Sequence, residues 1–168
     1  MPIYKAPVDD TLFLLDDVLH YARYDNLPGF ADASRDVVEH VLVEAAKLAE
    51  EVLQPINLSG DREGCKRAQD GSVTTPKGFK EAFKAYAEGG WISLPMPVEY
   101  GGQGLPQVLA QAVSEYTVSA NQAFAMYPGL TSGAVAAILA HGTEEQKQLY
   151  ATRMIAGQWT GTMNLTEP

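Results

Sequence analysis

The sequence predicts an all-α fold of about six helices, on the strength of three observations. Apolar residues recur at helical spacing through most of the chain. Prolines and glycines cluster between these periodic segments, where they end helices. A period-two pattern, which indicates a β-strand, is found from Trp159 to Thr166. We therefore expect a helical domain that ends at the first strand of a β-domain.

Composition limits the possible classes of protein. With 168 residues, of which 46% are apolar, the chain is long enough to bury one hydrophobic core. The net charge of −9 argues against nucleic-acid binding, which needs clustered Lys and Arg. Cys65 is the single cysteine, so an internal disulfide is impossible and a reducing compartment fits. Because neither a signal peptide nor an apolar run of about 20 residues is recognisable, we expect a cytoplasmic protein without a membrane span.

Two helices are predicted before Pro55. The first follows Asp9 and Asp10, ends before the breaker cluster at Asn26, and has an apolar side formed by Leu12, Leu15, Val18 and Leu19. Ser34 is the expected N-cap of the second helix. Its apolar stripe comprises Val37, Val41, Ala45, Leu48 and Val52, supported by Val38, Leu42 and Ala49. Pro55 is expected to end it.

A polar stretch from Asn57 to Ser72 is expected to form a surface loop of about 16 residues, which is functional or mobile. Thr75 and Pro76 then predict the N-cap and first position of a third helix. The buried side of this helix comprises Phe79, Ala82, Phe83 and Tyr86.

Residues 89–106, here called the hinge, separate the third helix from the fourth. They contain three of the ten prolines and five of the fifteen glycines. Proline fixes φ and glycine reaches positive φ without strain, so the hinge is predicted to form a rigid turn. Pro106 starts the fourth helix, whose apolar positions are Leu109, Ala112, Val113 and Tyr116.

A fifth segment, Gln122–His141, is expected to be interrupted at Pro128 and Gly129. Beyond the interruption it is apolar nearly all round, which indicates burial on several sides. Its small residues favour either close helix–helix packing or space for an apolar ligand; they include Gly129, Gly133 and Ala134. Thr143 and Gln146 form a capping box that opens a sixth helix, and Gly157 closes it.

Short sequence motifs give no sign of a metal or nucleotide site in this chain. His20, His40 and His141 lack a second ligand at fixed spacing, and the chain has neither HExxH nor CxxC, so we expect no metal site. The glycines of residues 101–104 follow no predicted strand, so a nucleotide-binding P-loop is excluded.

Four segments together resemble the N-terminal helical domain of flavin-dependent acyl-CoA dehydrogenases. They are residues 53–57 with 61–64 (Leu-Gln-Pro-Ile-Asn and Asp-Arg-Glu-Gly), 97–104 (Pro-Val-Glu-Tyr-Gly-Gly-Gln-Gly), 141–147 (His-Gly-Thr-Glu-Glu-Gln-Lys) and 163–168 (Met-Asn-Leu-Thr-Glu-Pro). The beginning of the chain resembles the N-terminal extension of a bacterial subgroup. That subgroup includes broad-range fatty acyl-CoA dehydrogenases and 3-methylmercaptopropionyl-CoA dehydrogenases.

The resemblance implies three regions: an extension helix over 1–35, the N-terminal helical domain over 36–157, and the start of a truncated middle β-domain over 158–168. Members of the family continue into that β-domain and a C-terminal four-helix domain. The chain is therefore expected to be the first part of a longer bacterial enzyme. Homo-oligomers, dimers or tetramers, are implied for the full-length protein.

The implied reaction is α,β-dehydrogenation of an acyl-CoA thioester to the 2-enoyl-CoA. A glutamate base removes the α-proton, FAD receives the β-hydrogen as hydride, and an electron-transferring flavoprotein reoxidises the flavin. The base lies beyond residue 168 in the family, so this chain is expected to hold no catalytic residue and to be inactive alone. Glu99 and Glu167 lie in turn motifs and are expected to be structural.

The resemblance also assigns binding residues. The flavin edge is expected to contact Met163, Leu165 and Thr166, although Asn164 replaces the family's usual Cys or Ala. The acyl chain is expected to contact Met126, Gly129, Leu130 and Gly133, where two glycines predict a roomy cavity.

Two alternatives remain open at this point. An acyl-CoA oxidase or flavin monooxygenase relative would share the family but use oxygen. A non-catalytic helical binding module is the other alternative, if the chain is naturally this short.

Overall fold

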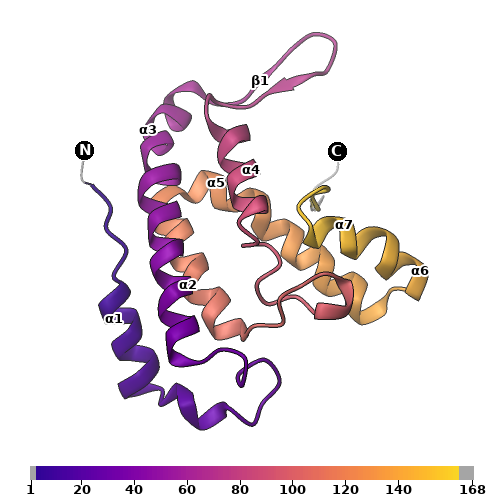
Figure 1. Ribbon diagram of the computed structural model, residues 1–168. Helices are drawn as coiled ribbons and strands as arrows, with labels where there is room; N and C mark the ends of the chain where they lie inside the picture. Colours follow the sequence, from indigo (N-terminus) through magenta and orange to yellow (C-terminus); the bar gives the residue numbers. More distant parts are fainter. Residues whose placement is uncertain (1–2, 163–168) are drawn as a thin grey trace.

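The computed structural model describes residues 3–162, and within them the all-α prediction is confirmed (Figure 1). The α-helices are α1 Val8–Phe13, α2 Arg35–Lys47, α3 Gln54–Glu63, α4 Phe79–Glu88, α5 Gln107–His141, α6 Glu144–Gln146 and α7 Thr152–Ile155. π-helical segments lie at Leu14–Val18, Leu48–Leu53 and Lys147–Ala151, and 3-10 turns at Tyr21–Tyr24 and Val98–Tyr100. Strands β1 Lys66–Arg67 and β2 Val73–Thr74 form an antiparallel hairpin.

The N-terminal helix buries only part of its predicted apolar side. Leu12 and Leu15 are buried, whereas Val18 and Leu19 are 53% and 49% exposed. The expectation for these two residues was wrong because the π-helical segment after Phe13 has more residues per turn and breaks the α-helical spacing. The helical run also ends earlier than expected, at His20, which adopts a left-handed conformation with φ 51°.

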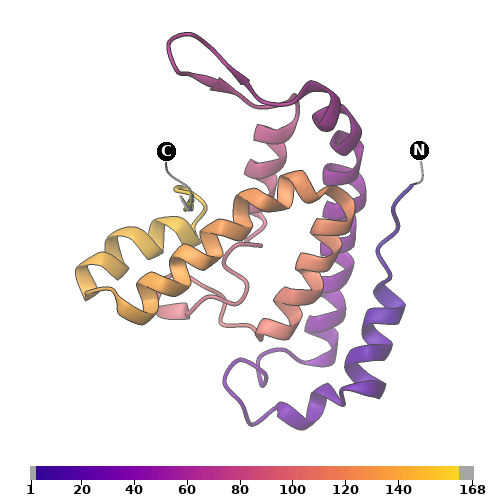
Figure 2. The same ribbon diagram turned by 180° about the vertical axis from the view of Figure 1, so that it is seen from behind.

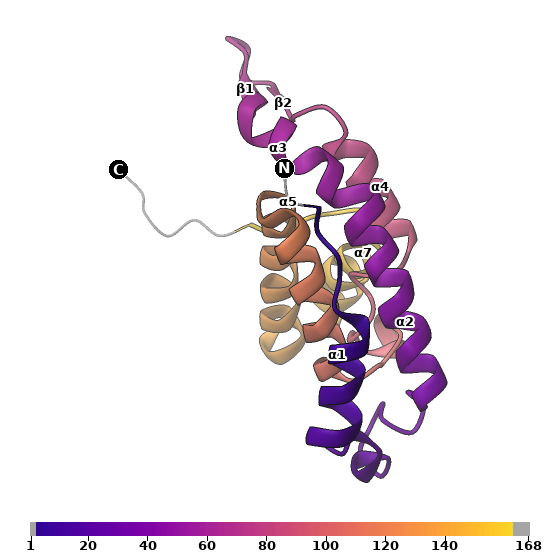
Figure 3. The ribbon, with the colours of Figure 1, turned by 90° about the vertical axis from the view of Figure 1, so that its left-hand side faces the viewer.

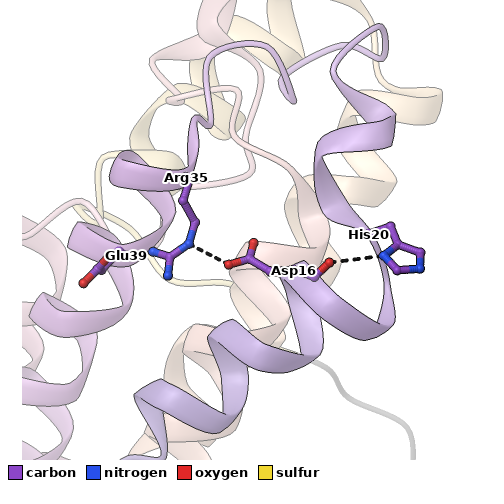
Figure 4. A network of polar contacts seen from close by, with 4 residues as sticks. All are labelled: Asp16, His20, Arg35 and Glu39. Atoms are coloured by element: carbon purple, nitrogen blue, oxygen red, sulfur yellow. Dashed lines mark hydrogen bonds and ion pairs between the residues drawn. The ribbon is translucent and has the colours of Figure 1, made fainter.

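Charged contacts fasten this N-terminal segment to the start of α2 (Figure 4). The Arg35 guanidinium donates from Nε to Asp16 at 2.6 Å and also pairs with Glu39 one turn along α2. The His20 ring nitrogen Nδ1 lies 3.3 Å from the backbone oxygen of Asp16. All four side chains are solvent-accessible, so solvent screening leaves each contact with only a small contribution to stability.

Helix α2 begins as predicted, because Ser34 Oγ accepts a hydrogen bond from the Val37 N–H at 3.5 Å. Its buried side is offset from the expected stripe. Val37 is 37% exposed, and Val41 and Val52 are half-buried. The buried residues are Val38, Leu42, Ala45, Ala46, Leu48, Ala49 and Leu53. Two adjacent apolar stripes exist on this helix, and helical spacing alone does not decide which one meets α1 and α5.

Pro55 does not end the helix, which corrects the prediction. The π-helical segment precedes it, so Pro55 occupies the first turn of α3, where its missing N–H is not needed. The predicted loop over residues 57–72 is consequently shorter. Helix α3 continues to Glu63, and the β1–β2 hairpin takes up most of the remainder.

Helix α4 starts at Phe79 and not at Thr75 and Pro76. Gly78 precedes it with φ 88°, and a Cβ there would lie 2.9 Å from Ile56 Cγ2. Phe79, Ala82 and Tyr86 are buried as predicted.

Helix α5 joins the predicted fourth and fifth segments across a break at Asn121, where φ is −160° and ψ is 88°. It passes without interruption through Pro128 and Gly129, contrary to the prediction. Pro128 removes one backbone donor, and the burial of its ring offsets that loss. Within residues 3–162, α5 is long and apolar enough to cross a membrane by length and composition alone, as many soluble core helices are.

The bend in α5 organises the fold (Figure 2). Its first half lies beside α2, and its second half lies beside α6 and α7. Seen from the side, α2 and α4 form one layer and α5 the other (Figure 3). The main hydrophobic core lies between these layers. A smaller cluster joins the hinge, the second half of α5 and the last helices through Met96, Tyr100, Val135, Ala151 and Ile155.

The hinge lies inside the bend and bonds to itself, which confirms the predicted turn. Gln103 Nε2 donates to the Gly90 carbonyl at 2.8 Å and to Ser93 Oγ at 3.0 Å. The Gln103 N–H donates to the Ser93 carbonyl at 2.9 Å, and the Leu105 N–H donates to the Leu94 carbonyl at 3.0 Å. Beyond the end of α5, the predicted capping box of Thr143 and Gln146 is present at the start of α6.

Gly102→Ala tests how tightly the hinge is folded. A Cβ at Gly102 would lie 2.0 Å from the Met96 carbonyl oxygen, so backbone must shift. We expect the free energy of unfolding in urea to fall by about 2–3 kcal/mol. The control is Gly101→Ala, where φ is 89° but nothing lies within 4 Å. Its expected loss is about 1 kcal/mol, from backbone strain alone. Equal losses in the two variants would contradict the close approach.

Candidate functional site

The predicted acyl-binding residues lie on one side of the second half of α5. Met126, Gly129, Leu130 and Gly133 follow the i, i+3, i+4, i+7 spacing that places side chains on a common face. Met126 is 57% exposed, both glycines are exposed and Leu130 is half-buried. This face, here called the α5 face, is thus an open apolar surface, and the expectation that this segment is buried on several sides was wrong.

The two glycines of the α5 face are not required for packing within the described residues. A Cβ built at Gly129 or at Gly133 meets nothing within 4 Å. Close helix–helix packing, one of the two interpretations of these small residues, therefore has no support in residues 3–162. The space they leave is open to a ligand or to another part of a protein.

A cavity of about 460 Å³ lies inside the bend of α5, between that helix and the hinge. Gly129 belongs to its lining, so the cavity adjoins the α5 face. The hinge contributes Trp91, Ile92 and Met96 among others, and α5 contributes Gln107, Gln111, Ser114, Ala125, Ser132 and Ala136. Tyr86 forms part of the wall, and burial raises its pKa to about 12, so its phenol stays neutral.

The last described residues pack against α5 beside Leu130. Buried Thr131 Oγ accepts a hydrogen bond from the Gly161 N–H at 3.1 Å and donates to the Tyr127 carbonyl at 3.3 Å. A Cβ at Gly161 would lie 2.6 Å from Ala134 Cβ and 3.5 Å from the Leu130 carbonyl oxygen. The contact is therefore close, and it needs glycine.

The predicted flavin contacts, Met163, Leu165 and Thr166, lie outside the described residues. The described part of the predicted strand, residues 159–162, is held by other means. The Trp159 ring stacks under the Arg153 guanidinium, whose carbon lies 4.5 Å from the ring centroid. The Trp159 backbone N–H donates to the Arg153 carbonyl at 3.2 Å. Residues 159–162 form no strand, and the rest of that strand stays a prediction.

Ionisable groups near the site have structural partners. The Tyr100 hydroxyl donates to Glu144 at 3.2 Å, and the Lys147 ammonium donates to the same carboxylate at 2.8 Å. Lys147 and Tyr100 together lower the pKa of Glu144. Glu99 is exposed on the hinge. Within the described part of the chain, His, Cys, Asp and Glu form no group of three suited to a metal ion.

Sequence reasoning missed the cavity, the break at Asn121 and the hydrogen bond between Thr131 and Gly161. Asn at a helix start is a recognised N-cap signal, and Asn121 directly precedes the predicted fifth segment. Gln107, Gln111 and Ser114 also share a helix face by spacing, but only the bend brings that face toward Gly129.

Comparison with known proteins shows what the chain resembles. Residues 35–158 match the family model described as "Acyl-CoA dehydrogenase, N-terminal domain". A 3-methylmercaptopropionyl-CoA dehydrogenase of Ruegeria pomeroyi is 37% identical over 98% of this chain, and a broad-specificity linear acyl-CoA dehydrogenase of Mycobacterium tuberculosis is 34% identical over 100%. The chain spans 28% and 27% of the length of these two relatives.

A solved structure supports the fold alone. It comes from work on the electron transferring flavoprotein of Acidaminococcus fermentans and superimposes with a TM-score of 0.63 at 23% identity. The match covers 78% of this chain and 32% of that one.

Gly133→Ala tests whether the α5 face is free of packing constraints. A helical glycine with open space around it is less stable than alanine, so we expect the free energy of unfolding to rise by about 0.5–1 kcal/mol. The control is Gly142→Ala, whose Cβ would lie 2.6 Å from the Ile138 carbonyl oxygen and which should destabilise the fold. Destabilisation by Gly133→Ala would show that the position is packed.

Thr131→Val tests how the end of the described chain is held. Valine has nearly the shape of threonine but offers no acceptor to the Gly161 N–H. We expect amide hydrogen exchange at Gly161 to accelerate about tenfold, as for the loss of one hydrogen bond. Ser132→Ala is the control, because among residues 3–162 Ser132 Oγ bonds only to the Pro128 carbonyl, at 3.2 Å. Unchanged exchange in Thr131→Val would mean that other contacts hold the segment.

Proposed function

The chain belongs to the acyl-CoA dehydrogenase family, and from that premise we propose that it supplies the N-terminal helical part of an FAD-dependent acyl-CoA dehydrogenase. The whole enzyme would convert an acyl-CoA thioester to its 2-enoyl-CoA. The chain spans 28% and 27% of the length of its two relatives, which supports a role as one part of such an enzyme. We further propose a bacterial cytoplasmic homo-oligomer that passes its electrons to an electron-transferring flavoprotein.

The observation that carries this proposal is the α5 face. It offers apolar contact at Met126 and Leu130, open space at Gly129 and Gly133, and a cavity that begins at Gly129. An acyl chain gains about 0.8 kcal/mol for each methylene that it buries, so such a surface suits an acyl group. Residues 122–140 contain no acidic side chain, which fits an uncharged ligand.

In this proposal the chain binds and orients the acyl group and keeps water away from it. Met163, Leu165 and Thr166 would hold the edge of the flavin, and Gly161, two residues before Met163, is bonded to Thr131 beside Leu130. When bound, FAD supplies the acceptor for the β-hydrogen. A carboxylate base from elsewhere in the enzyme would take the α-proton, since the α5 face offers none.

Expression of the full open reading frame tests the proposal. We expect a yellow protein whose flavin absorbance is bleached by acyl-CoA under anaerobic conditions. Reoxidation by an electron-transferring flavoprotein, without rapid oxygen consumption, would identify a dehydrogenase. Rapid oxygen consumption would identify an oxidase or monooxygenase relative, and a colourless protein inert to acyl-CoA would support a binding module and refute the proposal.

Gly129→Leu and Gly133→Leu in that enzyme test the acyl assignment. A Cβ at either site meets nothing within 4 Å inside the described residues, and both sites are exposed, so misfolding is not expected. Each leucine fills space proposed for the acyl chain, and kcat/KM should shift toward shorter acyl groups by about tenfold or more. Glu115→Leu is the control, because it adds an exposed leucine to α5 before the break. A flat chain-length preference in both glycine variants would show that the assignment is wrong.

A further inference from the structure

We propose that Asn121 is a positioning residue, which fixes the angle between the two halves of α5 and thereby selects the length of acyl group that the enzyme accepts. The proposal rests on the proposed function, because it concerns the same acyl site. It also makes a claim about the geometry of α5 that holds without any substrate.

Asn121 uses both ends of its carboxamide while fully buried, at 0% exposure. Its Oδ1 accepts a hydrogen bond from the Phe124 N–H at 3.0 Å, so it is the N-cap of the second half of α5. Its Nδ2 donates to the Leu53 carbonyl at 3.1 Å. Reversing the amide would face a donor with a donor and an acceptor with an acceptor, so these two bonds fix its orientation.

The partner of Asn121 is the irregular point of the neighbouring helix. Leu53 is the last residue of the π-helical segment between α2 and α3, and its side chain is also fully buried. The break in α5 is therefore fastened to the widened turn beside it. A helix end that only needed a cap would use Oδ1 and leave Nδ2 without a role. Here the second bond, from Nδ2 to the Leu53 carbonyl, fixes the orientation of this N-cap relative to the neighbouring helix.

The angle at Asn121 affects the cavity because both halves of α5 line it. Gln111 and Ser114 come from the first half, and Ala125 and Gly129 come from the second. Gly129 lies eight residues beyond the break, about 12 Å along the helix at 1.5 Å per residue. A rotation of about 10° at the break would move Gly129 by about 2 Å, which is more than one methylene of chain length.

Substrate preference distinguishes positioning from mere stability. Asn121→Ser keeps an oxygen that can cap the helix but removes the donor to Leu53, and Asn121→Ala removes both. We expect each variant of the full-length enzyme to change the ratio of kcat/KM for dodecanoyl-CoA to that for butanoyl-CoA by about tenfold. The matched control is Ser34→Ala, which removes the N-cap of α2 and should lower Tm while leaving this ratio unchanged. Unchanged ratios in both Asn121 variants would overturn the proposal.

A distance measurement tests the pivot without substrate. Spin labels at Glu115→Cys and Ala140→Cys, in a Cys65→Ser background, report the separation of exposed positions on the two halves. We expect the distance distribution to broaden or shift in Asn121→Ser and Asn121→Ala, and to stay unchanged in Ser34→Ala. A native distribution in both Asn121 variants would refute the pivot. Absence of acyl-CoA turnover in the wild type would instead refute the proposed function, and the distances would still decide the role of Asn121 in the bend.

Discussion

The bond from the Asn121 carboxamide to the Leu53 carbonyl is the constraint on which the arrangement of this domain depends. It joins the break in α5 to the widened turn between α2 and α3, deep in the main core. Asn121 is fully buried, and a buried donor without an acceptor is unfavourable by about 1–3 kcal/mol, so the bond to Leu53 stabilises the break. Because α5 bends there, its halves contact different partners, and one long helix supports two hydrophobic clusters.

The hinge fits inside that bend and links the two clusters. The backbone of the hinge and the Gln103 side chain form most of their hydrogen bonds within the hinge, so these bonds hold the loop in one conformation. Met96 and Tyr100 then bury their side chains against the second half of α5, and the Tyr100 hydroxyl reaches Glu144 at the start of α6. A flexible loop of the same length would lose more conformational entropy when it packed against the helices. The cavity is the space that remains between this rigid loop and the bent helix.

Signals that act within one turn were predictable from the sequence, including the Ser34 cap and the capping box at Thr143. The helix continued through Pro55 and Pro128 because a π-helical turn in one case and burial in the other offset a penalty that local rules treat as decisive. Spacing alone places Met126, Gly129, Leu130 and Gly133 on one side of α5, but the sequence predicted burial of this segment and not the exposure that the structure shows. The cavity could not be predicted from the sequence, because the hinge and the two halves of α5 come together only when α5 is bent.

The glycines of the α5 face support a functional reading of that face. Each glycine in a helix interior lowers stability by about 0.5–1 kcal/mol relative to alanine, and Gly129 and Gly133 are only four positions apart. Several other glycines lie where a Cβ would strike a neighbour, as at Gly102 and Gly161, or have positive φ, as at Gly101. At Gly129 and Gly133 the described structure provides no such neighbour. Glycines inside a helix that no packing contact requires are typical of a binding surface, where the absent side chain leaves space for a ligand.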